Sequence, residues 1–153
     1  MIIIFALFFN FIKAENFSVD GFTYSIDDNQ TLTLLSADCP SEKRQLQIPE
    51  TVTYNDVIYS VTKIGESAFR GCNNFIGDLI IPNSINEIQI GAFAECSGFT
   101  GALHFSENLQ TIGSNAFFQC SGFTGDLNIP SNVQSIGYQA FLGCSGFNGQ
   151  LTL

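Results

Sequence analysis

A repeat of 24 residues, running from Ile64 to Leu153, limits what this chain can fold into more than any other feature of its sequence. Its clearest copy, residues 112–130, reads Ile-Gly-Ser-Asn-Ala-Phe-Phe-Gln-Cys-Ser-Gly-Phe-Thr-Gly-Asp-Leu-Asn-Ile-Pro. Four sets of residues keep the step of 24: Cys72, Cys96, Cys120 and Cys144; Phe69, Phe93, Phe117 and Phe141; Phe75, Phe99, Phe123 and Phe147; and Leu79, Leu103, Leu127 and Leu151. Because the step does not change, each copy is predicted to form one structural unit.

A constant period of about 20–29 residues with regularly spaced Leu, Ile and Phe is typical of a leucine-rich-repeat solenoid, in which one coil cannot bury its apolar residues alone. Stacking brings equal positions into ladders, with neighbouring strands about 4.8 Å apart. We therefore predict a mainly β solenoid over residues 62–153, made of four 24-residue coils of which the last is incomplete. Residues 15–61 are predicted to form an N-terminal β cap with a degenerate first repeat, because terminal coils must cover the open end of a stack.

One segment of each copy is predicted to be a short parallel strand. Residues 126–129 alternate polar and apolar, which indicates a strand with one buried face. Pro130 follows directly and ends the strand, because proline cannot donate to a ladder. The outward positions of these strands are Asp78, Ile80, Ala102, His104, Asp126, Asn128, Gln150 and Thr152.

The rest of the coil has weaker signals. Residues 133–136 carry an apolar pair at a spacing of three, which predicts a bent strand or turn on the opposite side. Residues 117–120 span one helical turn, which predicts a short helix or 3₁₀ turn. Gly122 and Gly125 mark a corner that needs either positive φ or close approach. Asn74 replaces the first of these glycines in the first copy, and asparagine tolerates the left-handed region.

The pattern Ile-Gly-x-x-Ala-Phe-x-x-Cys-Ser-Gly-Phe-Thr-Gly-x-Leu-x-Ile-Pro resembles the leucine-rich repeats of BspA-like surface antigens, found on anaerobic bacteria and parasitic protists. The resemblance covers about 90 of the 153 residues. It implies a similar cap before the repeats and attachment to host cells, extracellular matrix proteins or other microbes. The matching positions are structural, so the resemblance does not indicate a particular ligand.

The cap has its own strand signals. Residues 17–35 alternate in two runs across the polar break at 27–30, which predicts a β-hairpin. The Asp27-Asp28-Asn29 group lacks the glycine and distal glutamate of an EF-hand loop, so we interpret it as a turn rather than a calcium site. Residues 46–49 repeat the strand-Pro pattern. Residues 56–59, which lie in an insertion, are predicted to form a further strand.

Residues 1–14 are predicted to be a signal peptide, because their apolar run has the length of a signal core and is well short of the ~20 residues that span a bilayer. An uncleaved interfacial or buried segment is the alternative. No later segment is long and apolar enough to be a transmembrane anchor. Asn16 and Asn29 each begin an N-glycosylation pattern, which matters only in an exported eukaryotic protein.

The cysteines of the repeat are predicted to form a column of buried thiols. Equal positions in a ladder have nearly parallel Cβ directions, whereas a disulfide needs its Cβ atoms to converge to about 3.8 Å. The sequence also has no Cys-x-x-Cys pair for a zinc site. Cysteine then acts as a small apolar side chain. Cys39, alone in the cap, is the one candidate for a reactive thiol.

Composition argues against several functions. With 5 Lys and Arg against 14 Asp and Glu, the net charge of −9 disfavours nucleic acid as a partner. His104 is the single histidine, too few for a metal site of ordinary ligand count. The chain has neither a nucleophile elbow nor a phosphate-binding glycine loop, so we expect no enzyme, no metal and no cofactor.

We therefore predict a secreted or cell-surface protein that contacts a protein ligand, such as a host-cell or matrix protein, through its outward strand residues. These residues differ between copies while their inward neighbours persist. The alternative is a structural spacer or incomplete repeat antigen without a ligand of its own. This alternative is based on the end of the sequence at Leu153, in the middle of a coil. An uncapped coil is expected to favour self-association, because it presents unpaired strand groups.

Overall fold

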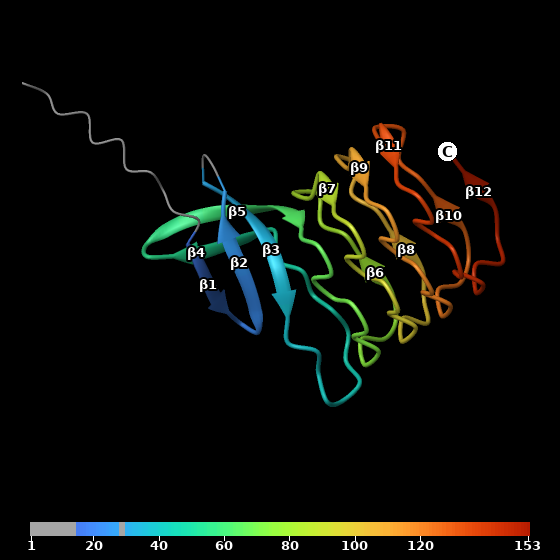
Figure 1. Ribbon diagram of the computed structural model, residues 1–153, viewed down its shortest axis with the longest axis horizontal. Helices are drawn as coiled ribbons and strands as arrows, with labels where there is room; N and C mark the ends of the chain where they lie inside the picture. The colour runs from blue at the N-terminus through green and yellow to red at the C-terminus, as the bar shows by residue number, and fades with distance from the viewer. Residues whose placement is uncertain (1–14, 28–29) are drawn as a thin grey trace, which may run out of the picture.

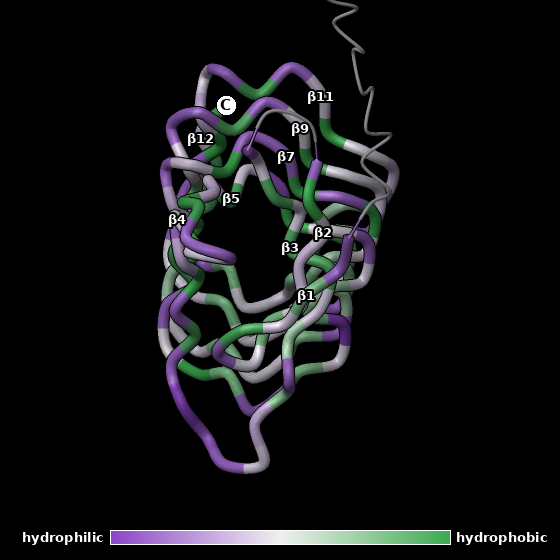
Figure 2. The backbone as a smooth tube through the Cα atoms, turned by 90° about the vertical axis from the view of Figure 1, so that its left-hand side faces the viewer, coloured by the Kyte–Doolittle hydropathy of each residue, from purple (hydrophilic) through white to green (hydrophobic). Residues whose placement is uncertain are grey.

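The computed structural model of the protein describes residues 15–27 and 30–153, and within these ranges it consists of strands and turns without a helix. Figure 1 shows an elongated solenoid in which the cap lies at one end and the coils follow one another to the C-terminus. In Figure 2, seen from the cap end, the coils lie one behind another around a common interior. The predicted repeat solenoid with an N-terminal β cap is confirmed.

The cap begins with three antiparallel strands, β1 (Asn16–Val19), β2 (Phe22–Ile26) and β3 (Thr31–Ala37). The predicted single hairpin over residues 17–35 is wrong in one respect, because the first alternating run folds back on itself. Asp20 and Gly21 have positive φ values of 52° and 78°, which reverse the chain between β1 and β2. The apolar positions change phase at this turn, from Phe17 and Val19 to Phe22 and Tyr24, and Asp-Gly is itself a hairpin turn signal, so the sequence does mark the break.

A second hairpin joins the cap to the repeats. It pairs β4 (Thr51–Tyr54) with β5 (Val57–Ile64) across a turn in which Asn55 and Asp56 have φ values of 49° and 62°. The further strand predicted at residues 56–59 is therefore the start of β5. This long strand also pairs in parallel with β3, so it connects the antiparallel cap to the parallel part of the fold.

One continuous sheet runs through cap and repeats. After β5 it adds β7 (Glu87–Ile88), β9 (Thr111–Ile112) and β11 (Ser135–Ile136), each parallel and in register with the strand before. Ile64, Ile88 and Ile112 occupy equal positions and are buried, while the residue before each lies on the outer face. Of the two alternatives predicted for residues 133–136, the strand is correct.

The opposite side of the solenoid carries two separate strand pairs. They are β6 (Leu79–Ile80) with β8 (Leu103–His104), and β10 (Leu127–Asn128) with β12 (Leu151–Thr152). Within a pair, an aspartate bridges the coils: Asp78 Oδ1 accepts from the Ala102 N–H at 2.8 Å, and Asp126 Oδ1 accepts from the Gln150 N–H at 2.7 Å. Ala102 has no carboxylate, and β8 and β10 are not paired in the described structure.

The Ala-Phe segments form turns rather than the predicted short helix or 3₁₀ turn. Alternate N–H groups point along the stack, so that Phe117 N–H donates to the Ala140 carbonyl of the next coil at 2.8 Å. The intervening groups bond within the coil, as from Phe118 N–H to the Asn115 carbonyl. This alternation requires left-handed residues, such as Asn115 and Gln119 with φ values of 56° and 59°, which a right-handed helix does not contain.

The interior is built from two columns of phenylalanine rings. In the first column Phe69, Phe93, Phe117 and Phe141 stack at centroid distances of 4.8, 5.3 and 5.4 Å. The second column consists of Phe75, Phe99, Phe123 and Phe147. The first three rings of each column are fully buried or nearly so. Stacking thus supplies the burial that one coil lacks, as the repeat predicts.

The predicted column of buried thiols is confirmed for Cys96 and Cys120, and Cys144 continues it as a half-buried free thiol. The thiols of Cys96, Cys120 and Cys144 donate to the carbonyl oxygens of Phe69, Phe93 and Phe117 in the preceding coils, at 2.9, 2.9 and 3.0 Å. Burial raises the pKa of the Cys96 thiol to about 12 and that of Cys144 to about 11. These side chains are therefore hydrogen-bond donors as well as small apolar groups.

The fourth repeat cysteine corrects two predictions. Cys72 forms a disulfide with Cys39, with the Cα atoms 5.1 Å apart, so it is not a free thiol and Cys39 is not a reactive one. The reason lies in the stack: Cys72 belongs to the first full coil, where the irregular cap precedes it in place of another repeat. The disulfide links the cap loop to this coil.

The repeat glycines confirm both expected roles at different places. Gly125 has a φ of +79°, whereas a Cβ on Gly122 would lie 2.1 Å from the Phe99 carbonyl oxygen, so that corner needs close approach. The expectation that Asn74 is left-handed is wrong, since its φ is not positive. In the first coil the cap loop replaces the close neighbour, and the Asn74 amide donates to the Pro40 carbonyl at 2.9 Å.

Candidate functional site

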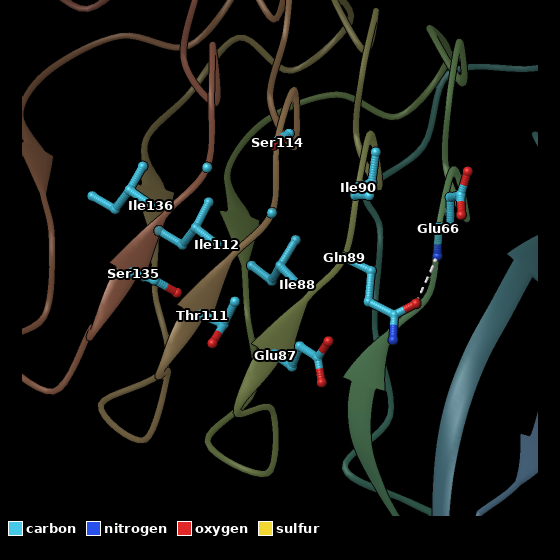
Figure 3. A pocket seen from close by; sticks show the side chains of 12 residues that line it. Glu66, Glu87, Ile88, Gln89, Ile90, Thr111, Ile112, Ser114, Ser135 and Ile136 are labelled. Atoms are coloured by element: carbon cyan, nitrogen blue, oxygen red, sulfur yellow. Dashed lines mark hydrogen bonds between the residues drawn. The ribbon is translucent and has the colours of Figure 1, made fainter.

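A groove of about 390 Å³ crosses the outer face of the continuous sheet over β7, β9 and β11. Figure 3 shows its residues in rows, each residue of a row coming from the next coil. One edge carries Glu87, Thr111 and Ser135, and the other edge carries Glu66, Ile90 and Ser114; we call these the strand edge and the turn edge. The groove therefore runs across the strands, along the axis of the stack.

Glycine backbone forms part of the floor of the groove. A Cβ on Gly113 would lie 2.6 Å from the Gln89 carbonyl carbon, and a Cβ on Gly137 would lie 2.2 Å from the Ser114 backbone nitrogen. Only glycine fits such an approach between coils. The absence of side chains at these two positions leaves a hollow between the edges. Stacking and the shape of the groove thus depend on the same residues.

The end of the groove nearest the cap is acidic. Glu66 is exposed and Glu87 is half-buried, and neither forms an ion pair with another described residue. The nearby cations are engaged elsewhere: Lys63 Nζ lies 3.6 Å from Asp27 Oδ2, and Arg70 Nη2 lies 2.7 Å from Glu95 Oε1. The lining of the groove contains no lysine or arginine. The lining residues therefore carry only negative charge, beside Lys63, which is the register partner of Glu87 on β5.

Ile90 gives the groove an apolar contact surface. Its side chain is 53% exposed, although the equal positions in the other coils carry Glu66, Ser114 and Tyr138. Ile88 and Ile112, which also line the groove, are buried, whereas Ile136 at the far end of the groove is 44% exposed. The Gln89 side chain lies between the two carboxylates of Glu66 and Glu87, where its Oε1 accepts from the Glu66 N–H at 3.2 Å.

The chemistry of the groove suits binding. Its hydroxyl groups, on Thr111, Ser114 and Ser135, have no histidine beside them, because His104 lies on the opposite side in β8. Among the residues that the structure describes, no three His, Cys, Asp or Glu side chains are grouped so as to hold a metal ion. An aliphatic surface, hydroxyls and carboxylates are the groups of a protein contact surface.

The eight predicted binding residues lie on the outer faces of the two strand pairs. All are exposed except the half-buried Ala102. Two of them have a structural role, since the Asp78 and Asp126 carboxylates accept hydrogen bonds from the next coil. His104 and Asn128 border a hollow of about 240 Å³ at the unpaired junction of β8 and β10. The residues predicted together are Asp78, Ile80, Ala102, His104, Asp126, Asn128, Gln150 and Thr152, and binding by this face stays a prediction.

The groove is not predicted from the sequence. Residues 133–136 and their equivalents are predicted to form only a bent strand or turn, and their outward neighbours receive no role. A signal was present in Ile90, a large apolar residue where the other copies have polar or amphipathic ones. The variation among Glu87, Thr111 and Ser135 was a second signal.

Sequence comparison agrees with this architecture. Residues 44–148 match the BspA type leucine rich repeat region, in six copies. The chain belongs to this family. Leucine-rich repeats of the BspA type generally serve as protein-binding surfaces, and such repeats are usually not catalytic. No curated protein matches this BspA-type chain.

Solved structures share the fold of this BspA-type protein. A leucine-rich repeat protein from Bacteroides capillosus ATCC 29799 is 28% identical, with a TM-score of 0.71 over 89% of this chain and 97% of that one. The T. pallidum leucine rich repeat protein is 19% identical, with a TM-score of 0.63 over 89% of this chain and 71% of that one. The pneumococcal vaccine antigen PcpA is 14% identical, with a TM-score of 0.50 over 90% of this chain and 49% of that one. At these identities the last two comparisons establish the fold alone.

Three further predictions concern the exterior of the BspA-type chain. Residues 1–14, predicted to be a signal peptide, lie outside the described residues, as does Asn29. Asn16 is exposed at the start of β1, where a glycan would not interrupt the coils. Across residues 15–27 and 30–153, no helix is long and apolar enough to cross a membrane.

Proposed function

We propose that this BspA-type chain is an exported surface module that mediates adhesion by binding a protein partner through the groove over β7, β9 and β11. The observation that carries the proposal is the position of Ile90, 53% exposed within the groove and close to carboxylates without an ion-pair partner among the described residues. Exposed apolar surface rimmed by polar groups is typical of protein contact sites. The continuous sheet holds this surface on a rigid frame.

The disulfide supports an extracellular location. Disulfides form and persist mainly in oxidising compartments, including the cell exterior. Cys39 and Cys72 are bridged here, and residues 1–14 have the composition of a signal peptide. Among proteins of similar fold, PcpA is a pneumococcal vaccine antigen, which is consistent with display at a cell surface. A host-cell protein, a matrix protein or a protein of another microbe would then be the partner.

A binding experiment with residues 15–153 tests the proposal. The oxidised protein is applied to whole host cells and to immobilised matrix proteins, and bound protein is measured against concentration. We expect saturable binding that falls at least about tenfold in Ile90→Asp, because a charge on the groove opposes apolar contact. A matched variant, Ile80→Asp, places the same charge on the equally exposed isoleucine of β6 and should bind normally. Equal losses in both variants would contradict the groove as the contact site.

The predicted face on β6, β8, β10 and β12 is the second candidate surface. It is tested by changing Ile80, His104, Asn128 and Thr152 together to alanine, which leaves the bridging carboxylates of Asp78 and Asp126 in place. Loss of binding in this variant alone would assign adhesion to that face.

The alternative function is a spacer or repeat antigen without a ligand. The last coil exposes apolar side chains, including Tyr138 at 74% and Leu151 at 63%, and this surface favours contact with a second copy. Light scattering on the same samples measures this self-association. Concentration-dependent association without binding to any cell or matrix protein would support the alternative and contradict an adhesion module.

A further inference from the structure

We propose that the groove selects a basic-aliphatic segment, an extended stretch of the partner that carries Lys or Arg, any residue, and then an aliphatic residue. The segment lies across the strands, with its cation between Glu66 and Glu87 and its aliphatic side chain against Ile90. This inference rests on the proposed function, since it specifies what the same groove recognises.

The charge of the groove favours a basic side chain in the partner. Two carboxylates line its end near the cap, on opposite edges and in neighbouring coils, with the Gln89 side chain between them. The cations closest in sequence, Lys63 and Arg70, already pair with Asp27 and Glu95. A cation supplied by the partner would therefore meet two carboxylates without having to break an existing ion pair. Charge complementarity of this kind sets partner choice and speeds association.

The groups along the groove follow a fixed order. The acidic end comes first and Ile90 follows on the turn edge; on the coils beyond lie the hydroxyls of Thr111, Ser114 and Ser135, with Ile112 buried and Ile136 44% exposed at the far end. This order gives the groove a direction. A segment that places its cation near the cap brings the next side chain on the same face toward the junction of Ile90 and Thr111.

The spacing of side chains along an extended segment differs from the spacing of the coils. Neighbouring strands of a sheet are about 4.8 Å apart, whereas side chains on one face of an extended chain recur at about 6.8 Å, which is two residues. A cation centred between the first and second coils lies about 2.4 Å along the stack from the first, so the following aliphatic side chain lies at about 9.2 Å, close to the third coil at about 9.6 Å. That position is beside the methyl group of Thr111 and about 4.4 Å along the stack from the coil of Ile90, within contact distance of the Ile90 side chain. The groove thus favours the order basic, any residue, aliphatic.

Two defined peptides test the proposal by NMR titration of the oxidised ¹⁵N-labelled residues 15–153. The probe is acetyl-Arg-Ser-Leu-Ser-Leu-amide, and its control is acetyl-Glu-Ser-Leu-Ser-Leu-amide. We expect the basic peptide to shift the amide signals of Ile90, Gly113 and Gly137 saturably, and the acidic peptide to leave them unchanged. Raising the salt from 0.15 M to about 0.5 M should weaken binding, because screening shortens the range of the charges. Equal shifts by both peptides, shifts centred on another face, or no shifts would overturn the proposal.

A pair of variants isolates the two carboxylates. Glu66→Gln with Glu87→Gln should weaken binding of the basic peptide by about tenfold or more, corresponding to about 1.4 kcal/mol. The matched control, Glu42→Gln with Glu50→Gln, removes the same total charge from exposed cap positions and should change the affinity less than about twofold. Equal weakening in both variants would mean that net charge alone attracts the peptide, and would contradict recognition by the groove.

The same variants separate this inference from the proposed function. If host cells or matrix proteins bind through Ile90 but are insensitive to Glu66→Gln with Glu87→Gln, the adhesion function holds and the basic-aliphatic partner is wrong. If the peptide binds as expected while no cell or matrix protein does, the recognition chemistry holds and the adhesion function is wrong.

Discussion

The thiol of Cys96 donates a hydrogen bond to the carbonyl oxygen of Phe69, in the coil before its own, at 2.9 Å. The same relationship recurs between Cys120 and Phe93. It links each Phe-containing turn to the cysteine of the following coil, 27 residues later. The cysteine column thus holds neighbouring coils together by directed bonds in addition to its apolar contacts.

The Cys96 thiol makes stability depend on pH in alkaline solution. Burial raises its pKa from the ordinary value of 9.0 to about 12. Below pH 9 both folded and unfolded chains hold the proton; above it the unfolded chain releases the proton first, so stability falls as pH rises toward 12. The expected slope is about 1.4 kcal/mol per pH unit for one thiol. Urea unfolding from pH 8 to 10.5 should show a shallower decline in Cys96→Ala than in the wild type, whereas identical slopes would exclude this thiol as the cause.

The disulfide between Cys39 and Cys72 should stabilise the cap against the first coil. It spans 33 residues, for which loop-closure entropy predicts about 3–4 kcal/mol. Thermal unfolding of Cys39→Ala with Cys72→Ala should therefore start at lower temperature than that of the oxidised wild type. Peptide mapping without reduction provides the control, since it should recover a single bridge joining residues 39 and 72. A bridge that includes Cys96, Cys120 or Cys144 would contradict the thiol column.

The phenylalanine columns should show a gradient of sensitivity along the stack. Phe117 is fully buried between Phe93 and Phe141, so Phe117→Ala should cost about 3–5 kcal/mol of unfolding free energy. Phe147 is half-buried in the last coil, and Phe147→Ala should cost at least about 1 kcal/mol less because less surface returns to water. Chemical denaturation measures both. Near-normal stability of Phe117→Ala would contradict the column of stacked phenylalanine rings.

Asp126 and Asn128 provide a matched pair on one strand. Asp126 Oδ1 accepts from the Gln150 N–H at 2.7 Å, whereas Asn128 is exposed and points outward. Asp126→Ala should lower the unfolding free energy by about 1 kcal/mol, and Asp126→Asn, which keeps an acceptor oxygen, should recover most of it. Asn128→Ala should change stability by less than about 0.5 kcal/mol. A larger loss of stability in Asn128→Ala than in Asp126→Ala would contradict the structural role of Asp126 and the outward, unbonded position of Asn128.

Much of the fold could be predicted from the sequence, because equal positions of the four repeats can be compared within the one chain. Phe117 and Leu103 are predicted to face inward since their equivalents never become polar, and both are buried. The helical prediction for residues 117–120 failed because consecutive turns have the same apolar spacing as one helical turn. The distinguishing feature is the left-handed backbone at Asn115 and Gln119. Asparagine tolerates this conformation, but the positions equivalent to Asn115 carry Ser67, Gly91 and Gln139, so the residue type does not identify it.

The disulfide and the groove depend on tertiary context. Cys72 has the same place in the repeat as the other cysteines, although Asn73 and Asn74 follow it where Ser and Gly follow the others, and the cap that precedes it in space brings Cys39 beside it. The groove required knowing that β7, β9 and β11 form the continuous sheet. Two-residue strands carry too little alternation to reveal that, although the unusual Ile90 could have directed attention to this face.

The most direct test of the groove as the contact surface compares two isoleucines in the bound protein. Ile90 in the groove and Ile80 on the opposite side are 53% and 58% exposed, so hydroxyl radicals should oxidise both at similar rates in the free protein. Footprinting is then repeated after saturation with a cell or matrix protein that binds. We predict strong protection of Ile90 and unchanged oxidation of Ile80. Protection of Ile80 with Ile90 still oxidised would contradict the groove and assign binding to the face of β6 and β8.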